Sequence, residues 1–171
     1  DCAILNPPYR KIQTESRERK LLRKVGVETS NLYTGFLAIT IRLLALGGEM
    51  VAITPRSFCN GPYFEPFRRF LLASMRFRRV HVFESRDRAF AADEVLQENV
   101  IFRADKTMTG DERVIVSSNQ GPDDPNGVTR LVRHDDLVRP DDPHAFIHIV
   151  PNGDGDEIRV AQVVVRRRGI G

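Results

Sequence analysis

A short apolar run, Cys2–Leu5, stops at Asn6-Pro7-Pro8-Tyr9, and this junction constrains the fold more than any other feature of the sequence. The two prolines cannot continue a hydrogen-bonded strand, so they end it and hold the chain in an extended turn. The Asn6 side chain and the Pro7 carbonyl then point beyond the strand end as hydrogen-bond acceptors. Tyr9 adds a flat aromatic face on which a planar ring can stack.

Residues 10–105 continue with alternating helical and extended patterns. Arg10–Thr29 is polar and charge-rich, which predicts a loop or a mobile helix, and Arg68 and Arg69 fall on the polar side of a later helix. The elements predicted after residue 29 are a helix at Leu32–Leu46 stopped by Gly47-Gly48, a strand at Met50–Thr54, a helix at Tyr63–Met75 and strands at Val80–Phe83 and Leu96–Phe102. This alternation predicts an open α/β sheet with crossover helices. Ligands of such sheets bind beyond the carboxyl ends of the strands, where Asn6–Tyr9 lies.

The pattern changes after about residue 105. A cluster of Gly, Pro, Asp and Asn at residues 121–127 marks a turn between short apolar runs. The predicted elements are strands at Arg113–Ser118, Thr129–Val132 and Ala145–Val150, followed by a helix at Asp156–Ile170. Residues 106–171 are therefore expected to form a mixed α+β extension of the sheet domain.

Four segments in order resemble one known family. Ile4–Tyr9 resembles the catalytic motif of adenine-specific DNA methyltransferases of restriction–modification systems, which use S-adenosylmethionine. The other three segments that resemble this family are Asn31–Leu37, Gly47–Phe58 and Val95–Phe102. The resemblance implies that residues 1–105 are the C-terminal half of a Rossmann-like class I catalytic domain, with its later strands only. Residues 106–171 would then lead toward a target-recognition domain.

The resemblance also implies the chemistry of the motif, with Asn6, Pro7, Pro8 and Tyr9 as catalytic residues. The Asn6 side-chain oxygen and the Pro7 carbonyl would each accept one N–H of the adenine amino group, which aims the nitrogen lone pair at the sulfonium methyl. Catalysis of this kind depends on positioning and electrostatic stabilisation. The base must leave the duplex to reach the motif. It would then stack on Tyr9, and Phe90 is the candidate for a second aromatic contact.

The cofactor site implied by the resemblance is incomplete in this sequence. In the family, S-adenosylmethionine is held largely by a Gly-containing loop after the first strand and by an acidic residue after the second, and neither is found here. Asn6 and Pro7 would form only the edge of the cofactor pocket. We therefore expect these 171 residues to be a fragment without the N-terminal half and the target-recognition domain, and to be inactive alone.

Basic residues follow the motif directly and suit a polyanionic partner. Arg10, Lys11, Arg17 and Lys20 are candidates for contacts with the phosphates of double-stranded DNA near the flipped base. A solvated, mobile face explains the same residues equally well. The net charge of +3 agrees with a nucleic-acid partner but does not identify one.

Composition narrows the remaining function classes. No apolar run reaches the roughly 18 residues that a membrane helix needs, and the chain start does not resemble a signal peptide. The two cysteines, Cys2 and Cys59, have no metal-ligand spacing, so we expect reduced thiols in a cytoplasmic protein. The histidines show no zinc-ligand pattern either, so no metal is assigned.

Three function classes stay open at this point. The tetrapeptide fits an adenine-specific DNA methyltransferase, which the ordered neighbouring segments favour. The same amine chemistry serves methylation of a glutamine side-chain amide in a protein or of a guanine amine in RNA. A noncatalytic binding or assembly segment is the third possibility.

Overall fold

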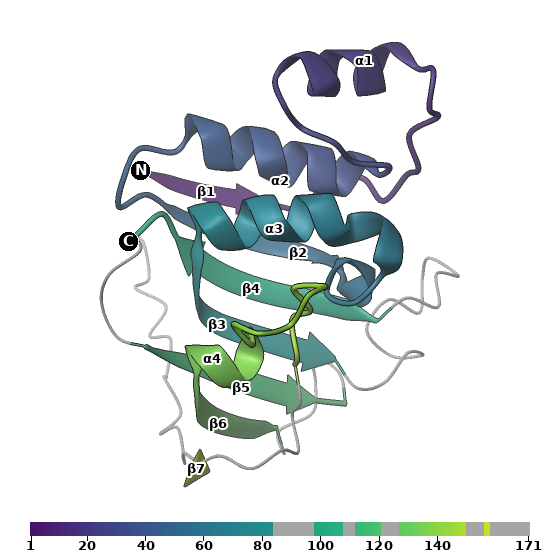
Figure 1. Ribbon diagram of the computed structural model, residues 1–171. Coiled ribbons are helices and arrows are strands. Elements are labelled where there is room, and N and C mark those ends of the chain that lie inside the picture. Colours follow the sequence, from purple (N-terminus) through teal and green to yellow (C-terminus); the bar gives the residue numbers. More distant parts are fainter. Residues whose placement is uncertain (84–97, 108–111, 121–126, 150–155, 158–171) are drawn as a thin grey trace, which may run out of the picture.

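The computed structural model describes residues 1–83, 98–107, 112–120, 127–149 and 156–157. Within these residues the chain forms one seven-stranded mixed sheet in the order β1-β2-β4-β3-β5-β6-β7 (Figure 1). The strands are β1 (Cys2–Leu5), β2 (Glu49–Pro55), β3 (Arg76–Phe83), β4 (Asn99–Asp105), β5 (Arg113–Asn119), β6 (Val128–Arg133) and β7 (Asp156–Glu157). The helices are α1 (Arg17–Lys24), α2 (Leu32–Leu43), α3 (Glu65–Ser74) and α4 (His134–Leu137), with short 3-10 turns η1 (Arg56–Phe58) and η2 (Pro62–Phe64).

The sheet is mixed, with parallel and antiparallel strand pairs. β1 pairs in parallel with β2, and β3 pairs in parallel with β5. β4 enters between β2 and β3 and is antiparallel to both. β1, β2, β3 and β5 therefore all end at the same edge of the sheet, as the predicted α/β alternation requires.

The core lies between the sheet and the two helices that cover one of its faces, α2 and α3 (Figure 1). Leu37 and Ile41 of α2 and Leu71 of α3 belong to one buried cluster with Met50 of β2 and Phe102 of β4. Alternate residues of β2 and β4 face this layer because successive side chains in a strand point to opposite faces. The apolar positions that predicted the helices are thus the positions that attach them to the sheet.

The helix predicted at Leu32–Leu46 ends earlier than expected. α2 ends at Leu43 rather than Leu46, because Leu44 already has an extended backbone. Gly47 then adopts φ 77°, and a Cβ on Gly48 would lie only 2.9 Å from the Ala45 carbonyl oxygen. The two glycines therefore shape the turn into β2 instead of ending the helix. α1, at Arg17–Lys24, is an ordered helix within the stretch predicted as a loop or mobile helix.

The placement of Arg68 on a polar helix face is wrong, because this side chain is 0% exposed. Its guanidinium donates hydrogen bonds to the carbonyl oxygens of Phe58 (3.1 Å), Gly61 (2.5 Å) and His144 (3.0 Å). It also lies 5.0 Å from the centre of the Phe146 ring. Helical spacing cannot reveal this, since His144 and Phe146, which cover the guanidinium together with the nearby Phe58 and Gly61, lie more than 70 positions away.

The strand predicted at Ala145–Val150 falls largely in this covering segment, residues 139–149, and the prediction is wrong. Ala145–Val150 does not form a strand over its described residues, since Ala145 has φ 51° and the following N–H groups bond outside any ladder. Ile147 N–H donates to the Cys59 carbonyl, and His148 N–H donates to the Leu137 carbonyl. The predicted helix at Asp156–Ile170 begins instead with β7, and its residues 158–170 lie outside the described ranges.

Candidate active site

The motif Asn6–Tyr9 lies at the carboxyl edge of the sheet. β1 ends at Leu5, which is paired in parallel with Ala52, and the chain leaves the sheet at Asn6. Pro7 is buried, whereas Asn6 is exposed. The turn is therefore anchored in the protein by its first proline and presents the Asn6 amide to solvent, where ligands of open α/β sheets bind.

The Tyr9 hydroxyl is the structural partner of Asn6. Its oxygen lies 3.2 Å from Asn6 Oδ1 and 3.2 Å from the Ile53 carbonyl oxygen. Burial raises the pKa of Tyr9, and the single proton of its hydroxyl is shared between these two acceptors. The side-chain oxygen that the sequence assigns to a target amino group is thus held in place by a hydroxyl of the same motif.

Tyr33 and Ser57 form a second layer behind Tyr9 that sequence patterns did not assign to the site. The Tyr9 ring meets the Tyr33 ring edge-on, with 6.1 Å between centroids and 80° between planes. The Tyr33 hydroxyl lies 3.2 Å from Ser57 Oγ, and burial raises the pKa of Tyr33. Both residues fall in segments that resemble the methyltransferase family, Asn31–Leu37 and Gly47–Phe58. Their place in these segments was the sequence signal that could have assigned them to the site.

Two of the predicted basic residues stand directly beside the motif. The Arg10 carbonyl accepts a hydrogen bond from Leu32 N–H at 2.8 Å, which ties the residue after Tyr9 to the start of α2. A polar cavity of about 270 Å³ opens here, lined by Arg10, Lys11, Ile12, Gln13, Ser16, Glu18 and Leu32. Arg17 and Lys20 lie farther along the chain in α1, where Lys20 forms an ion pair with Glu15 at 3.2 Å.

The described residues do not show a second stacking residue, a metal site or a membrane helix. Phe90, the candidate for a second stacking contact, lies outside the ranges that the structure describes. Across those ranges, no group of three or more His, Cys, Asp or Glu side chains is placed to hold a metal ion. None of the described helices is long and apolar enough to cross a membrane.

Comparison of the sequence with known proteins places the chain in one family. Residues 1–90 match the family model described as Eco57I restriction-modification methylase. Type II methyltransferase M.PstI of Providencia stuartii is 52% identical over 150 residues, which cover 88% of this chain and 30% of that protein. Type II methyltransferase M.BsuBI of Bacillus subtilis is also 52% identical over 150 residues, covering 86% of this chain and 29% of that protein. The chain thus spans about a third of the length of these curated relatives.

Solved structures agree on the fold. A protein described as a class I S-adenosylmethionine-dependent methyltransferase from Listeria monocytogenes superimposes with a TM-score of 0.56 at 12% sequence identity. The match covers 72% of this chain and 38% of that one. Together with the strand order, this likeness confirms the predicted α/β sheet of the Rossmann-like class I methyltransferases.

Proposed function

The chain belongs to the Eco57I restriction-modification methylase family, and from that premise we propose that it carries the catalytic motif of an adenine-specific DNA methyltransferase. The reaction is transfer of a methyl group from S-adenosylmethionine to the exocyclic amino group of adenine. One observation supports this assignment above the others. Asn6 is exposed at the carboxyl end of a parallel strand, and its side-chain oxygen is fixed by the Tyr9 hydroxyl at 3.2 Å.

The proposed roles follow from the chemistry of the acceptors. Asn6 Oδ1 and the Pro7 carbonyl accept the two N–H groups of the amine and orient its lone pair. Pro7 and Pro8 keep this turn rigid, so little reorganisation is needed when the target arrives. The face of Tyr9 stacks on the flipped base. S-adenosylmethionine, when bound, supplies the electrophilic methyl group, and Asn6 and Pro7 border its site.

The Tyr9 hydroxyl has a specific part in this scheme. Without a target base, it occupies the Asn6 acceptor and keeps the amide in one orientation. An arriving amino group takes over that acceptor, while the Ile53 carbonyl remains within 3.2 Å for the hydroxyl proton. Tyr9 therefore exchanges one acceptor for another without leaving its half-buried hydroxyl unsatisfied.

The partners proposed here are S-adenosylmethionine and double-stranded DNA, with Phe90 as a second aromatic contact and Arg10, Lys11, Arg17 and Lys20 near the phosphates. We propose that residues 1–105 are catalytic and that residues 106–171 lead to target recognition. β5 nevertheless continues the catalytic sheet by pairing with β3. The enzyme is proposed to act in the cytoplasm.

The intact enzyme is proposed to extend beyond these 171 residues, in keeping with relatives of which the chain spans about 30%. The missing parts would be the N-terminal half of the catalytic domain, with most of the cofactor site, and the target-recognition domain. The 171 residues alone are then expected to bind S-adenosylmethionine weakly and to show no turnover.

The test is to identify the atom that receives the methyl group. The intact enzyme is incubated with labelled S-adenosylmethionine and, separately, with mixed-sequence duplex DNA, RNA and protein acceptors. Label recovered on the adenine amino group supports the proposal. Label on a glutamine amide or on a guanine amine in RNA, with DNA unmodified, would replace it with the alternative amine chemistry.

A further inference from the structure

Residues 10–31, here called the basic excursion, leave the sheet directly after Tyr9 and return at the start of α2. Lys11 and Asn31 form an isolated antiparallel bridge, and Ile12 N–H donates to the Ser30 carbonyl at 2.7 Å. The two limbs of the excursion are therefore paired at their base, immediately beside the motif. The base of the excursion is therefore held next to Asn6–Tyr9.

The basic excursion has a small core of its own. Ile12, Leu22 and Val27 are 7%, 7% and 5% exposed. A Cβ on Gly35 of α2 would lie 3.0 Å from Leu22 Cδ1, so α1 approaches α2 closely at this point. The Thr29 hydroxyl also forms a hydrogen bond with the hydroxyl of Thr34 in α2. These contacts favour an ordered platform over the solvated, mobile face that the sequence left open.

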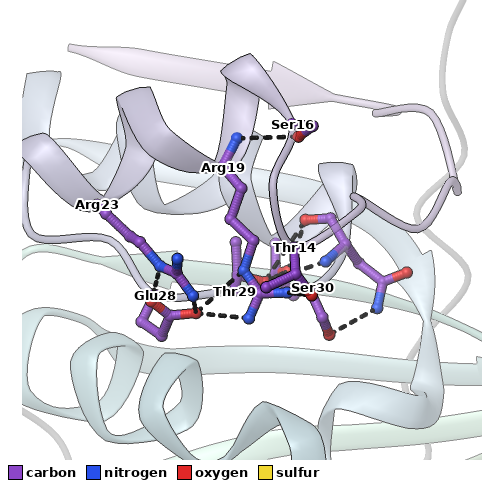
Figure 2. Close-up of polar contacts among 9 residues, drawn as sticks. Thr14, Ser16, Arg19, Arg23, Glu28, Thr29 and Ser30 are labelled. Carbon is purple, nitrogen blue, oxygen red and sulfur yellow. Dashed lines mark hydrogen bonds and ion pairs between the residues drawn. The ribbon is translucent and has the colours of Figure 1, made fainter.

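The arginines on one face of α1 form ion pairs within the basic excursion (Figure 2). Arg19 and Arg23, one helical turn apart, both reach Glu28, with Arg19 Nη2 2.6 Å from Oε1 and Arg23 Nε 2.7 Å from Oε2. The Arg19 side chain is only 17% exposed. These two arginines fasten α1 to the returning limb and are occupied, so they are poor candidates for an external anion.

A second set of cations lies on the opposite side of α1 from its buried residue. Arg17, Lys20 and Lys24 are spaced by three and four positions, which places them on one stripe of a helix. At about 100° per residue, this stripe is turned roughly 180° from Leu22, the buried residue of α1. The three positions span about 10 Å along the helix axis.

Two carboxylates lie near this stripe: Glu15, which is paired with Lys20, and Glu18, which interacts electrostatically with Arg17. Arg17 and Lys24 are exposed, and Lys20 forms an ion pair with Glu15 in which both side chains are more than half exposed. An ion pair of that kind contributes little stability and yields readily to another anion. About 10 Å corresponds to roughly three base-pair steps of about 3.4 Å along the axis of duplex DNA.

Building on the proposed function, we propose that the stripe of Arg17, Lys20 and Lys24 binds the phosphodiester backbone of duplex DNA beside the target base. Figure 1 shows α1 near the end toward which the β1 arrow points, the end that leads to Asn6. The stripe thus retains two of the basic residues predicted from the sequence and adds Lys24. It assigns Arg19 and Arg23 to the internal structure of the excursion instead.

The test measures the salt dependence of DNA binding by the intact enzyme. The variant Arg17→Gln/Lys24→Gln removes two stripe charges and leaves the Lys20–Glu15 pair in place. The matched control, Arg79→Gln/Arg139→Gln, removes two exposed charges in β3 and after α4, away from α1. Affinity for mixed-sequence duplex DNA is measured between about 50 and 200 mM salt, together with the rate of methyl transfer at saturating DNA.

We expect the stripe variant to reduce the slope of log affinity against log salt by about 1.8, because each phosphate contact contributes about 0.9. The control should keep both the wild-type slope and the wild-type rate of methyl transfer at saturating DNA. An unchanged slope in the stripe variant, or an equal reduction in the control, would contradict the proposal that the stripe binds DNA. The slope could fall as expected in the stripe variant while the wild-type enzyme transfers no methyl group to adenine. That result would support DNA binding by the stripe and reject the proposed function.

Discussion

Two regions of this chain hold polar side chains under opposite conditions: the turn after β1, and the contact between α3 and residues 139–149. In the turn, the Asn6 amide is exposed and its partner is a hydroxyl three residues away. In the contact, the Arg68 guanidinium is fully buried and reaches His144, 76 residues away. A local, exposed acceptor is suited to exchanging partners with a ligand. A distant, saturated donor is suited to holding the structure together.

The comparison predicts that the two regions separate function from stability. Changes at Asn6 and Tyr9 should alter methyl transfer with little effect on unfolding. Changes at Arg68 should alter unfolding with little effect on the transfer rate of the molecules that remain folded. A mixed result at either region would show that the division is wrong.

Arg68→Met gives the largest expected effect on stability. The change keeps much of the aliphatic volume but removes the guanidinium donor from the carbonyl groups of Phe58, Gly61 and His144, so we expect a loss of about 2–4 kcal/mol in the free energy of unfolding. Urea denaturation of the intact enzyme measures this loss. Arg69→Met, at the exposed neighbour, is the control and should cost much less. A loss below about 0.5 kcal/mol at Arg68 would contradict its structural role.

Tyr9→Phe should have an intermediate effect, and on catalysis alone. The ring remains available for stacking, but the hydroxyl that orients Asn6 is lost, so kcat/KM should fall by roughly 2- to 10-fold. Steady-state methyl transfer measures the change, and Tyr33→Phe tests whether the next layer matters less. An unaltered kcat/KM in Tyr9→Phe would show that the hydroxyl does not position the amide.

Glu28→Gln should have the smallest effect, and that effect should depend on pH. Hydrogen bonds from Arg23 and Arg19 lower the pKa of Glu28 below its ordinary value of 4.5. The stabilisation is therefore present above pH 4.5 and is lost as the pH falls through the lower pKa of the folded state. Because these side chains are partly exposed, we expect a melting temperature lower by only about 1–2 °C at neutral pH. The difference should vanish in acid, and a difference that grows in acid would contradict this assignment.

The sequence was informative where the determining residues are neighbours in the chain. Asn6–Tyr9 carries its own turn, acceptors and ring in four positions, so its place at a strand end followed from local chemistry. The alternating apolar patterns also predicted most strands and both covering helices. Arg68 could not be placed this way, because its burial depends on where residues 139–149 return, and helical spacing alone put it in solvent.

The basic excursion lies between these cases. Sequence patterns identified its cations, and the spacing of Arg17, Lys20 and Lys24 was visible in the chain. Which cations are occupied depends on Glu28, and its position follows from the turn at Gly26, where φ is 69°. The role of Tyr33 was missed for a related reason, since a buried aromatic residue on a helix has the same pattern whether or not it supports a site.

The central claim is that Asn6 is the amide that orients a target amine for methylation, and the most direct test is the rate of methyl transfer to duplex DNA by Asn6→Ala. In the intact enzyme, kcat is expected to fall by about 100- to 1,000-fold with the free energy of unfolding unchanged. The matched variant Asn60→Ala, which removes another exposed asparagine, should keep the wild-type rate. A near wild-type rate in Asn6→Ala, or equal losses in both variants, would contradict the assignment.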